Sequence, residues 1–188
     1  EMLSVELGSG LLGQIYDGLQ NPLPNLAQEA GYFLKPGVYI RALDSDRKWD
    51  FTPLAKPGQT VTAGETLGTV PEGIFTHRIM APFALTGSCK VESVVSAGQY
   101  TIEQEIAVLV DESGKKIPVK MVQSWPVKRA LNVSRRRLMP EHPLVTRVRI
   151  IDSMFPILRG GTYCIPGPFG AGKTVLQQIT SRHAEIDI

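Results

Sequence analysis

The sequence predicts a mainly β fold, with a β-rich module in the middle of the chain and the beginning of an α/β domain at its end. The 188 residues include 18 glycines and 14 prolines, which favour many turns and short strands over a helical bundle. Residues 55–70 and 85–102 share a similar placement of glycines among β-type residues, typical of a small quasi-symmetric barrel or sandwich. Near the end, a short apolar segment leads into a glycine-rich loop and a helical pattern. We therefore predict a lead-in segment, an inserted β-rich module and a truncated α/β domain, at residues 1–31, 32–122 and 123–188.

Composition and charge narrow the class of protein. Hydrophobic residues make up 43% and charged residues 20% of the chain, as in ordinary globular domains. The net charge of +2 gives no reason to expect a nucleic-acid partner. The two cysteines are too few for a disulfide framework and favour a reducing, cytosolic compartment. No stretch resembles a signal peptide or approaches the roughly 20 apolar residues of a membrane span, so we expect a soluble chain.

The lead-in segment opens with a predicted strand at Leu3–Leu7 and a glycine-rich turn. Residues 11–20 carry apolar side chains at helical or mixed spacing, and we expect Pro22 and Pro24 to end that element. From residue 32 the pattern changes to β, with apolar runs at 37–44 and 48–55.

The β-rich module is punctuated by turn signals. Pro57-Gly58 and Ala63-Gly64 mark tight turns, and Val61, Leu67 and Val70 are the candidates for inward-facing residues. Residues 106–127 form a further predicted hairpin, with its turn at residues 112–114. We assign four aromatic residues to the core or to a domain junction: Trp49, Phe51, Trp125 and Phe155.

After this module the chain is basic and interrupted by prolines. A short helix is predicted near Thr146–Met154, ended by Pro156. Residues 161–166 read as a buried strand that contains Cys164 as a small core residue. The helix that follows the glycine-rich loop should place Val175, Leu176 and Ile179 on its buried side.

The glycine-rich loop carries the strongest functional signal. Residues 167–174, "GPFGAGKT", match the pattern of a glycine, four residues, and then Gly-Lys-Ser/Thr. In such a loop, glycines let successive N–H groups turn toward phosphate oxygens, and the helix dipole adds positive potential. Lys173 would reach the β- and γ-phosphates, and the Thr174 hydroxyl would bind Mg²⁺. A chance match in an ordinary turn is the alternative, and the strand–loop–helix context favours phosphate binding.

The wording of several stretches resembles the catalytic A subunit of A-type and V-type rotary ATPases. The resemblance covers essentially the whole chain, in order, and rests on the stretches "LSVELGSGLLGQIYDGLQNPL", "GVYIRALDSDRKWDFTPLAKPGQTVTAGETLGTV", "THRIMAP", "SWPVKRALNVSRRRLMPEHPLVTRVRIIDSMFP", "RIIDSMFPILRGG" and "IPGPFGAGKTV".

This resemblance implies a peripheral, cytoplasmic subunit that alternates with B-type sister subunits in a hexameric ring. It implies contacts with central and peripheral stalk subunits, with the membrane reached only through the complex. ATP hydrolysis or synthesis would be coupled to H⁺ or Na⁺ movement, with ATP and Mg²⁺ as ligands. Lys173 would act in catalysis and Thr174 at the metal, and the nucleotide-binding set would be Gly167, Pro168, Phe169, Gly170, Ala171, Gly172, Lys173, Thr174 and Val175.

The chain also departs from that family. Residues 146–149 read "TRVR" where the family commonly has Thr-Gly-Gln-Arg, and Ala171 stands where relatives often have Ser or Cys. The family's catalytic Glu, acidic metal strand and adenine pocket lie downstream of Ile188, so we expect an internal piece of a longer subunit. Asp187 is interpreted as a structural residue. We expect the 188 residues by themselves to have negligible ATPase activity. We also expect the last 40 or so residues to be loosely held or paired with another copy.

Other hypotheses compete with the rotary-ATPase resemblance. The stretch "KPGQTVTAGETLGTV" resembles biotinyl and lipoyl carrier domains of barrel-sandwich-hybrid fold, but residues 69–89 lack the lysine that such carriers modify. Arg135-Arg136-Arg137, near Lys128 and Arg129, reads as a solvated basic stretch rather than a nucleic-acid or lipid site. The histidines lie at no metal-ligand spacing to a cysteine, so no zinc site is predicted. The alternative of another class is a non-catalytic β interaction module for stalk or regulatory subunits, with the loop a passenger.

Overall fold

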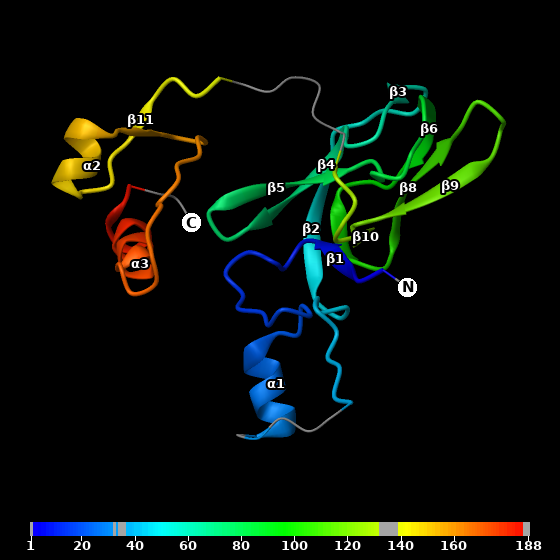
Figure 1. Cartoon of the computed structure of the whole chain (residues 1–188). Coiled ribbons are helices and arrows are strands. Elements are labelled where there is room, and N and C mark those ends of the chain that lie inside the picture. Colours follow the sequence, from blue (N-terminus) through cyan, green and yellow to red (C-terminus); the bar gives the residue numbers. More distant parts are fainter. Residues whose placement is uncertain (1, 32, 34–36, 132–138, 186–188) are drawn as a thin grey trace. The chain divides into compact units, whose positions relative to one another are not determined.

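The computed structural model describes residues 2–31, 33, 37–131 and 139–185. It comprises two compact units, Glu1–Ser134 and Arg135–Ile188, which are described here one at a time (Figure 1). The domain boundaries predicted after residues 31 and 122 divide the chain by sequence pattern, whereas these two units are separated by their internal contacts. The predicted boundaries therefore stay predictions.

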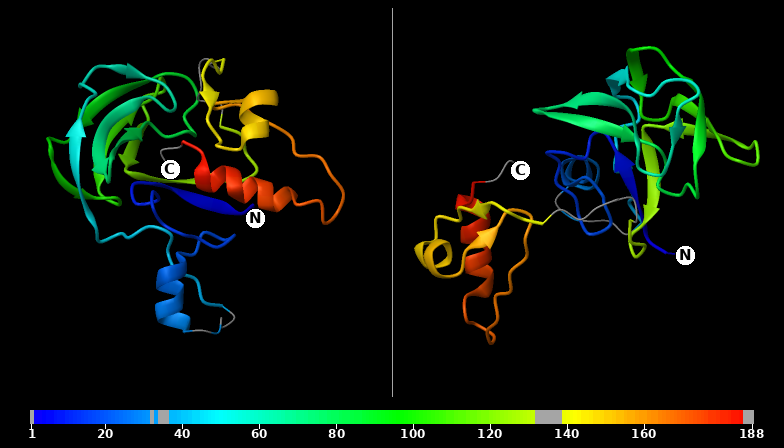
Figure 2. Two further views of the ribbon diagram at one scale, coloured as in Figure 1. Left: turned by 90° about the vertical axis from the view of Figure 1, so that its left-hand side faces the viewer. Right: turned by 90° about the horizontal axis from the view of Figure 1, so that it is seen from above.

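The first unit is built on two four-stranded antiparallel sheets, with strand orders β5-β4-β2-β7 and β3-β6-β8-β9. The cyan-to-green ribbons of Figures 1 and 2 trace these sheets. The mainly β prediction is therefore confirmed. The eight strands are β2 (Lys48–Pro53), β3 (Thr60–Val61), β4 (Thr66–Glu72), β5 (Phe75–Met80), β6 (Cys89–Val94), β7 (Gly98–Thr101), β8 (Glu105–Val110) and β9 (Lys116–Lys120).

A separate two-stranded ladder joins the start of the chain to the end of the module. β1 (Ser4–Gly8) runs antiparallel to β10 (Val122–Pro126), with Ser4 opposite Pro126 and Gly8 opposite Val122. The predicted strand at Leu3–Leu7 is thus confirmed within one residue. Residues more than a hundred positions apart in sequence form neighbouring strands at this ladder.

One hydrophobic core takes side chains from both four-stranded sheets. Alternation along the strands directs every second residue inward, as in β2, where Trp49 and Phe51 are buried between exposed neighbours. The predicted inward-facing residues Val61, Leu67 and Val70 are all buried, each at most 1% exposed. Cys89 is buried in the same core and carries a free thiol, and its burial raises the thiol pKa.

The first long apolar run of the module was predicted to be β-like, but residues 37–44 form no strand. Side chains occupy the backbone groups that a neighbouring strand would need. The Asn21 side chain accepts a hydrogen bond from the Ile40 N–H, and the Tyr16 hydroxyl donates to the Ala42 carbonyl. The segment is therefore held by side-chain hydrogen bonds instead of a ladder.

The hairpin formed by β8 and β9 has its turn where the sequence predicts it. Gly114 adopts a φ of 82°, which glycine tolerates without steric cost. The Asp111 carboxylate accepts hydrogen bonds from the Ser113 hydroxyl and N–H and from the Lys115 N–H. The Ser113 hydroxyl contributes most to holding the pKa of Asp111 below its usual value.

The helix of the lead-in segment starts where it was expected to end. α1 spans Leu23–Ala30, with Pro22 as its N-cap and Pro24 in its first turn, whereas residues 11–20 form no helix. The prediction was wrong because proline is disfavoured inside a helix but suits its first turn, where the N–H has no intrahelical acceptor. Gly31, with a φ of 69°, ends the helix.

The second unit contains little regular structure. A two-residue ladder pairs β11 (Pro143–Leu144) with β12 (Ile157–Leu158), and the two helices are α2 (Arg149–Met154) and α3 (Lys173–His183). α2 falls within the predicted helical stretch and ends before Pro156. Among the described residues of this unit, the buried ones are Thr146, Ile151, Ile157 and Thr180.

Two predictions of burial in the second unit were wrong. Residues 161–166 form no strand, and Cys164 is exposed. Phe155 is 72% exposed and so lies outside the core, while its alternative assignment to a domain junction stays a prediction. A strand requires a neighbour to accept its backbone hydrogen bonds, and no described segment pairs with these residues. In the described part of the chain, no helix is long and apolar enough to cross a membrane.

Candidate functional site

The glycine-rich loop folds as a tight turn followed by the first residue of a helix. The Ala171 N–H donates to the Pro168 carbonyl at 3.3 Å, and Gly170, at the third position of this turn, has a φ of 77°. That combination is the signature of a type II turn, which requires a positive φ at this position. Gly172 also has a φ of 77° and is the N-cap of α3. Both glycines therefore hold backbone conformations that side-chain-bearing residues rarely adopt.

The backbone comes close to itself inside the loop. A Cβ added at Gly167 would lie 3.3 Å from the Cβ of Ala171 and 3.7 Å from the side chain of Lys173. The loop is thus a compact ring of small residues, with Phe169 fully exposed at its tip.

Lys173 is the first residue of α3, and its side chain folds back over the loop. Its Nζ donates to the Gly167 carbonyl at 2.6 Å and also to the Pro168 carbonyl. A positive charge is therefore held against the loop, beside the positive end of the α3 dipole. An anion bound by the loop would compete with these carbonyls for the ammonium group, because the attraction between opposite charges exceeds that between a charge and a carbonyl dipole.

The remaining predicted site residues lie on the exposed face of α3. Thr174 is exposed and next to Lys173 in the first turn. Val175 and Ile179 are 58% and 40% exposed and Leu176 is half-buried, so the predicted buried side of the helix was wrong. Thr180 is the buried residue of α3, and its hydroxyl donates to the Leu176 carbonyl. The helix packs by its C-terminal half, where the Glu185 N–H donates to the Val145 carbonyl.

Comparison with known proteins supplies the family. Residues 40–128 match the model of the ATP synthase alpha/beta subunit barrel-sandwich domain, in agreement with the barrel-sandwich-like module predicted from the sequence. Over all 188 residues, the chain is 58% identical to the V-type ATP synthase alpha chain of Treponema denticola. It is 54% and 53% identical to the proteins of the same name from Borrelia garinii subsp. bavariensis and Borreliella afzelii.

The chain belongs to the V-type ATP synthase alpha-chain family. This confirms the resemblance drawn from the sequence alone. The match covers 100% of this chain but 32–33% of the length of these three relatives. The chain thus spans about a third of the V-type ATP synthase alpha chains that it matches.

A bend with an unusual backbone conformation lies in front of the loop, at Thr146-Arg147. Arg147 has a φ of 62°, a conformation that glycine adopts far more readily than a residue with a side chain. The Asp152 carboxylate holds this bend, since it accepts hydrogen bonds from the Thr146 N–H and hydroxyl and from the Arg147 N–H. The Thr146 hydroxyl is the main cause of the lowered pKa of Asp152.

Sequence reasoning missed this Asp152 cluster. Thr146 is completely buried, and Asp152 lies six residues later, one turn into α2. The only signal was an acidic residue in the first turn of a short helix. Because the helix was predicted to begin near Thr146 itself, a hydrogen bond from the Asp152 carboxylate back to the segment before the helix was not expected.

The described residues of this chain contain no group of three or more His, Cys, Asp or Glu side chains placed to hold a metal ion. Thr174 therefore remains a predicted magnesium ligand as a single hydroxyl. Mg²⁺ is commonly bound through one or two protein groups, with substrate phosphates and waters as the other ligands.

Two further sequence assignments meet different outcomes. Arg129 stacks on Trp125 at 5.1 Å and its carbonyl accepts a hydrogen bond from the Trp125 indole, which accounts for the burial of that ring. The Arg135–Arg137 run and Asp187 lie outside the described residues, so their assignments stay predictions.

Proposed function

We propose that this chain supplies the phosphate-binding loop of the catalytic subunit of a rotary, ion-translocating ATPase. The observation that carries the proposal is the position of Lys173 at the start of α3, with its ammonium group drawn over the loop of Gly167–Gly172. Membership of the V-type ATP synthase alpha-chain family supports it. ATP and Mg²⁺ are the proposed ligands.

In this function, each residue of the loop has a separate task. The backbone N–H groups of Gly170 and Gly172 would turn toward the phosphate oxygens, the Ala171 N–H would leave the Pro168 carbonyl to join them, and the dipole of α3 would add positive potential. Lys173 would leave the carbonyls of Gly167 and Pro168 and neutralise charge on the β- and γ-phosphates. The Thr174 hydroxyl would hold Mg²⁺, which would offset charge that develops on the transferred phosphoryl group.

The complex that we propose around this chain follows from the same resemblance. B-type sister subunits would alternate with this subunit in the cytoplasmic head, and stalk subunits would connect the head to the membrane sector. Hydrolysis or synthesis of ATP would then be coupled to H⁺ or Na⁺ movement.

Calorimetric titration with Mg-ATP tests the nucleotide site. We expect binding by the unchanged chain and loss of that binding in Lys173→Ala, because a charge-assisted contact worth about 1.5–3 kcal/mol is removed. Arg182→Ala is the matched control, since Arg182 is a cation in the last turn of the same helix. Equal binding by the unchanged chain and Lys173→Ala would refute the proposed role of the loop.

We expect this chain to bind ATP without catalysing its hydrolysis at an appreciable rate. We expect negligible steady-state ATP hydrolysis, because in-line attack also requires a group that orients water and a cation that offsets developing charge. Phosphate release that requires Mg²⁺ and is abolished by Lys173→Ala would contradict this expectation.

A second function is supported by a different observation, the complete core of the first unit. Seventeen buried hydrophobic residues form that core. We therefore propose, as the alternative, a non-catalytic module that binds stalk or regulatory subunits. Pull-down of such subunits by the whole chain, unchanged in Lys173→Ala and without any Mg-ATP binding, would favour this alternative.

A further inference from the structure

β1 is an edge strand on the side that faces away from β10. In the described part of the chain, it pairs with β10 alone (Figure 1). Along an antiparallel ladder, successive residues direct their N–H and C=O groups alternately toward the partner strand and away from it. The Val127 N–H donates to the Leu3 carbonyl, so Leu3 faces β10. Glu6, three positions later, therefore directs both of its backbone groups outward, where they are a template for a further strand.

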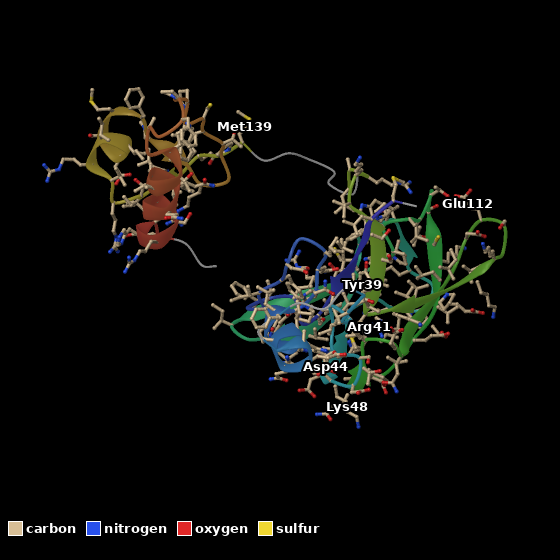
Figure 3. The ribbon with its side chains drawn as sticks, turned by 60° about the horizontal axis from the view of Figure 1, so that its bottom comes forward. Tyr39, Arg41, Asp44, Lys48, Glu112 and Met139 are labelled. Carbon is tan, nitrogen blue, oxygen red and sulfur yellow. The ribbon has the colours of Figure 1, made fainter. Side chains whose placement is uncertain are left out.

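The side chain of Gln20 occupies this outward position. Its Oε1 accepts a hydrogen bond from the Glu6 N–H at 2.7 Å, and its Nε2 donates to the Glu6 carbonyl at 2.7 Å. A carboxamide has the acceptor and the donor of a peptide group, so it replaces a residue of a neighbouring strand. The Glu6 side chain is held separately, because Nε of Arg41, labelled in Figure 3, donates to its Oε1 at 3.1 Å.

The turn that carries Gln20 is held by its own hydrogen bonds. The Asp17 carboxylate accepts from the N–H groups of Leu19 and Asn21 and from the Asn21 side chain. Gln20 has a φ of 65°, a left-handed conformation that costs energy for a residue with a side chain. Such strain persists only where surrounding contacts hold it, and here these are the contacts of Asp17 and Glu6. The carboxamide is thus fixed in place against β1.

We propose that the Gln20 carboxamide prevents copies of this chain from associating strand to strand at the outer edge of β1. Without it, the Glu6 N–H and C=O would be unpaired, and the same edge of a second copy could satisfy them. Ser4, two positions earlier, also directs its backbone groups outward, so the exposed edge would extend beyond one residue. The contact is independent of the proposed nucleotide function, because it uses no residue of the loop at 167–174.

Sedimentation equilibrium of the whole chain tests this proposal. A range from about 10 µM to 1 mM detects even a dimer with a millimolar dissociation constant. We expect Gln20→Ala to have a higher average mass than the unchanged chain at the upper concentrations. Association through other surfaces is common to both proteins and cancels in the comparison. Gln14→Ala is the matched control, because Gln14 is an exposed glutamine of the same segment whose side chain forms no hydrogen bond with the described residues.

Amide exchange at Glu6, followed by NMR, locates the association. In dilute Gln20→Ala this N–H should exchange faster than in the unchanged chain, and it should slow again as copies associate. Adding Ser4→Lys should abolish the association, since lysines on an edge oppose strand pairing, whereas aggregation of a partly unfolded variant would persist.

Three results would overturn the proposal. The first is an average mass of Gln20→Ala equal to that of the unchanged chain, even if the variant is less stable, since that is what a purely structural role of Gln20 predicts. The second is association that leaves the Glu6 amide in rapid exchange. The third is association that persists when Ser4→Lys is added.

Discussion

At the scale of single residues, close packing explains why position 68 is a glycine, although no turn requires one there. Gly68 lies in β4, where it pairs with Pro53 of β2 and with Ile79 of β5. A Cβ at this position would lie 2.3 Å from the ring of Phe51 and 2.7 Å from the Thr52 carbonyl oxygen. Phe51 is 1% exposed, so its ring has no room to move away.

Gly68→Ala is therefore expected to destabilise the first unit by about 1–3 kcal/mol, the usual cost of overpacking a core. Chemical denaturation followed by Trp fluorescence measures the change. Gly18→Ala is the control, because nothing lies within 4 Å of an added Cβ there. A free energy of unfolding equal in the two variants would mean that Phe51 repacks without cost.

A buried carboxylate joins the lead-in loop to the hairpin formed by β4 and β5. Glu72 is 5% exposed, and its Oε1 accepts hydrogen bonds from the N–H groups of Gly10 and Leu12 at 2.7 and 3.2 Å. Its Oε2 lies 2.7 Å from Nδ1 of His77. One side chain thus fixes two segments about sixty residues apart in sequence.

We expect Glu72→Gln to lower the free energy of unfolding by about 1–3 kcal/mol, because hydrogen bonds to a buried charge are lost. Glu92→Gln serves for comparison, since Glu92 forms an exposed ion pair with Lys116 that should contribute less than about 1 kcal/mol. Equal effects of the two substitutions, measured by urea denaturation, would argue against a structural role for the buried carboxylate.

At the scale of elements, the bend in front of α2 depends on the charge of Asp152. Hydrogen bonds from Thr146 and Arg147 hold the pKa of Asp152 below its unfolded value. A lowered folded-state pKa stabilises the bend above the unfolded value of about 3.9, and the contribution is lost as pH falls through the folded pKa.

Amide exchange and chemical shifts of Thr146 and Arg147 should therefore be constant near neutral pH and change in the acid range, below about pH 4. In Asp152→Asn this acid transition should be absent, because the side chain no longer titrates. A transition of the same size in Asp152→Asn would assign the pH dependence to another group.

Local sequence patterns correctly predicted those strands and turns of the first unit whose side chains are buried within that unit. Trp49, Phe51 and Val61 follow the alternation of their strands, and residues 112–114 carry turn residues, so each signal was complete in a few positions. Cys164 and Val175 were predicted buried, yet their burial depends on neighbours that no described segment supplies. The loop pattern predicted the position of Lys173, whereas Asp152 accepts hydrogen bonds from residues five and six positions earlier, a spacing that no short motif encodes.

At the scale of the whole molecule, the two units differ in how much apolar surface they bury. The first has a core of seventeen hydrophobic residues, whereas Ile151 and Ile157 are the buried hydrophobic residues of the described part of the second. Exposed apolar side chains in the second unit include Met154, Phe155 and Phe169. Each Å² of apolar surface removed from water contributes about 25 cal/mol to stability, so burial stabilises the first unit far more than the second.

Hydrogen exchange followed by mass spectrometry should separate the two units. We expect strong protection in β4, β6 and β8 and rapid exchange throughout α3, because local stability follows buried contacts. Mg-ATP should slow exchange in α3 if the loop binds it. Protection of α3 equal to that of β8 without any ligand would show that the second unit is stable by itself.

The ladder of β1 and β10 also determines how the first unit responds to force. Ser4, where the chain enters, lies opposite Pro126, where it leaves, so both connections are at the same end of the ladder. Tension applied through them would separate the five residue pairs one after another, as in a zipper, rather than load all of them at once. The two four-stranded sheets would carry no load until this ladder had opened. Under tension, the ladder of β1 and β10 would therefore open before the two sheets that contain the core.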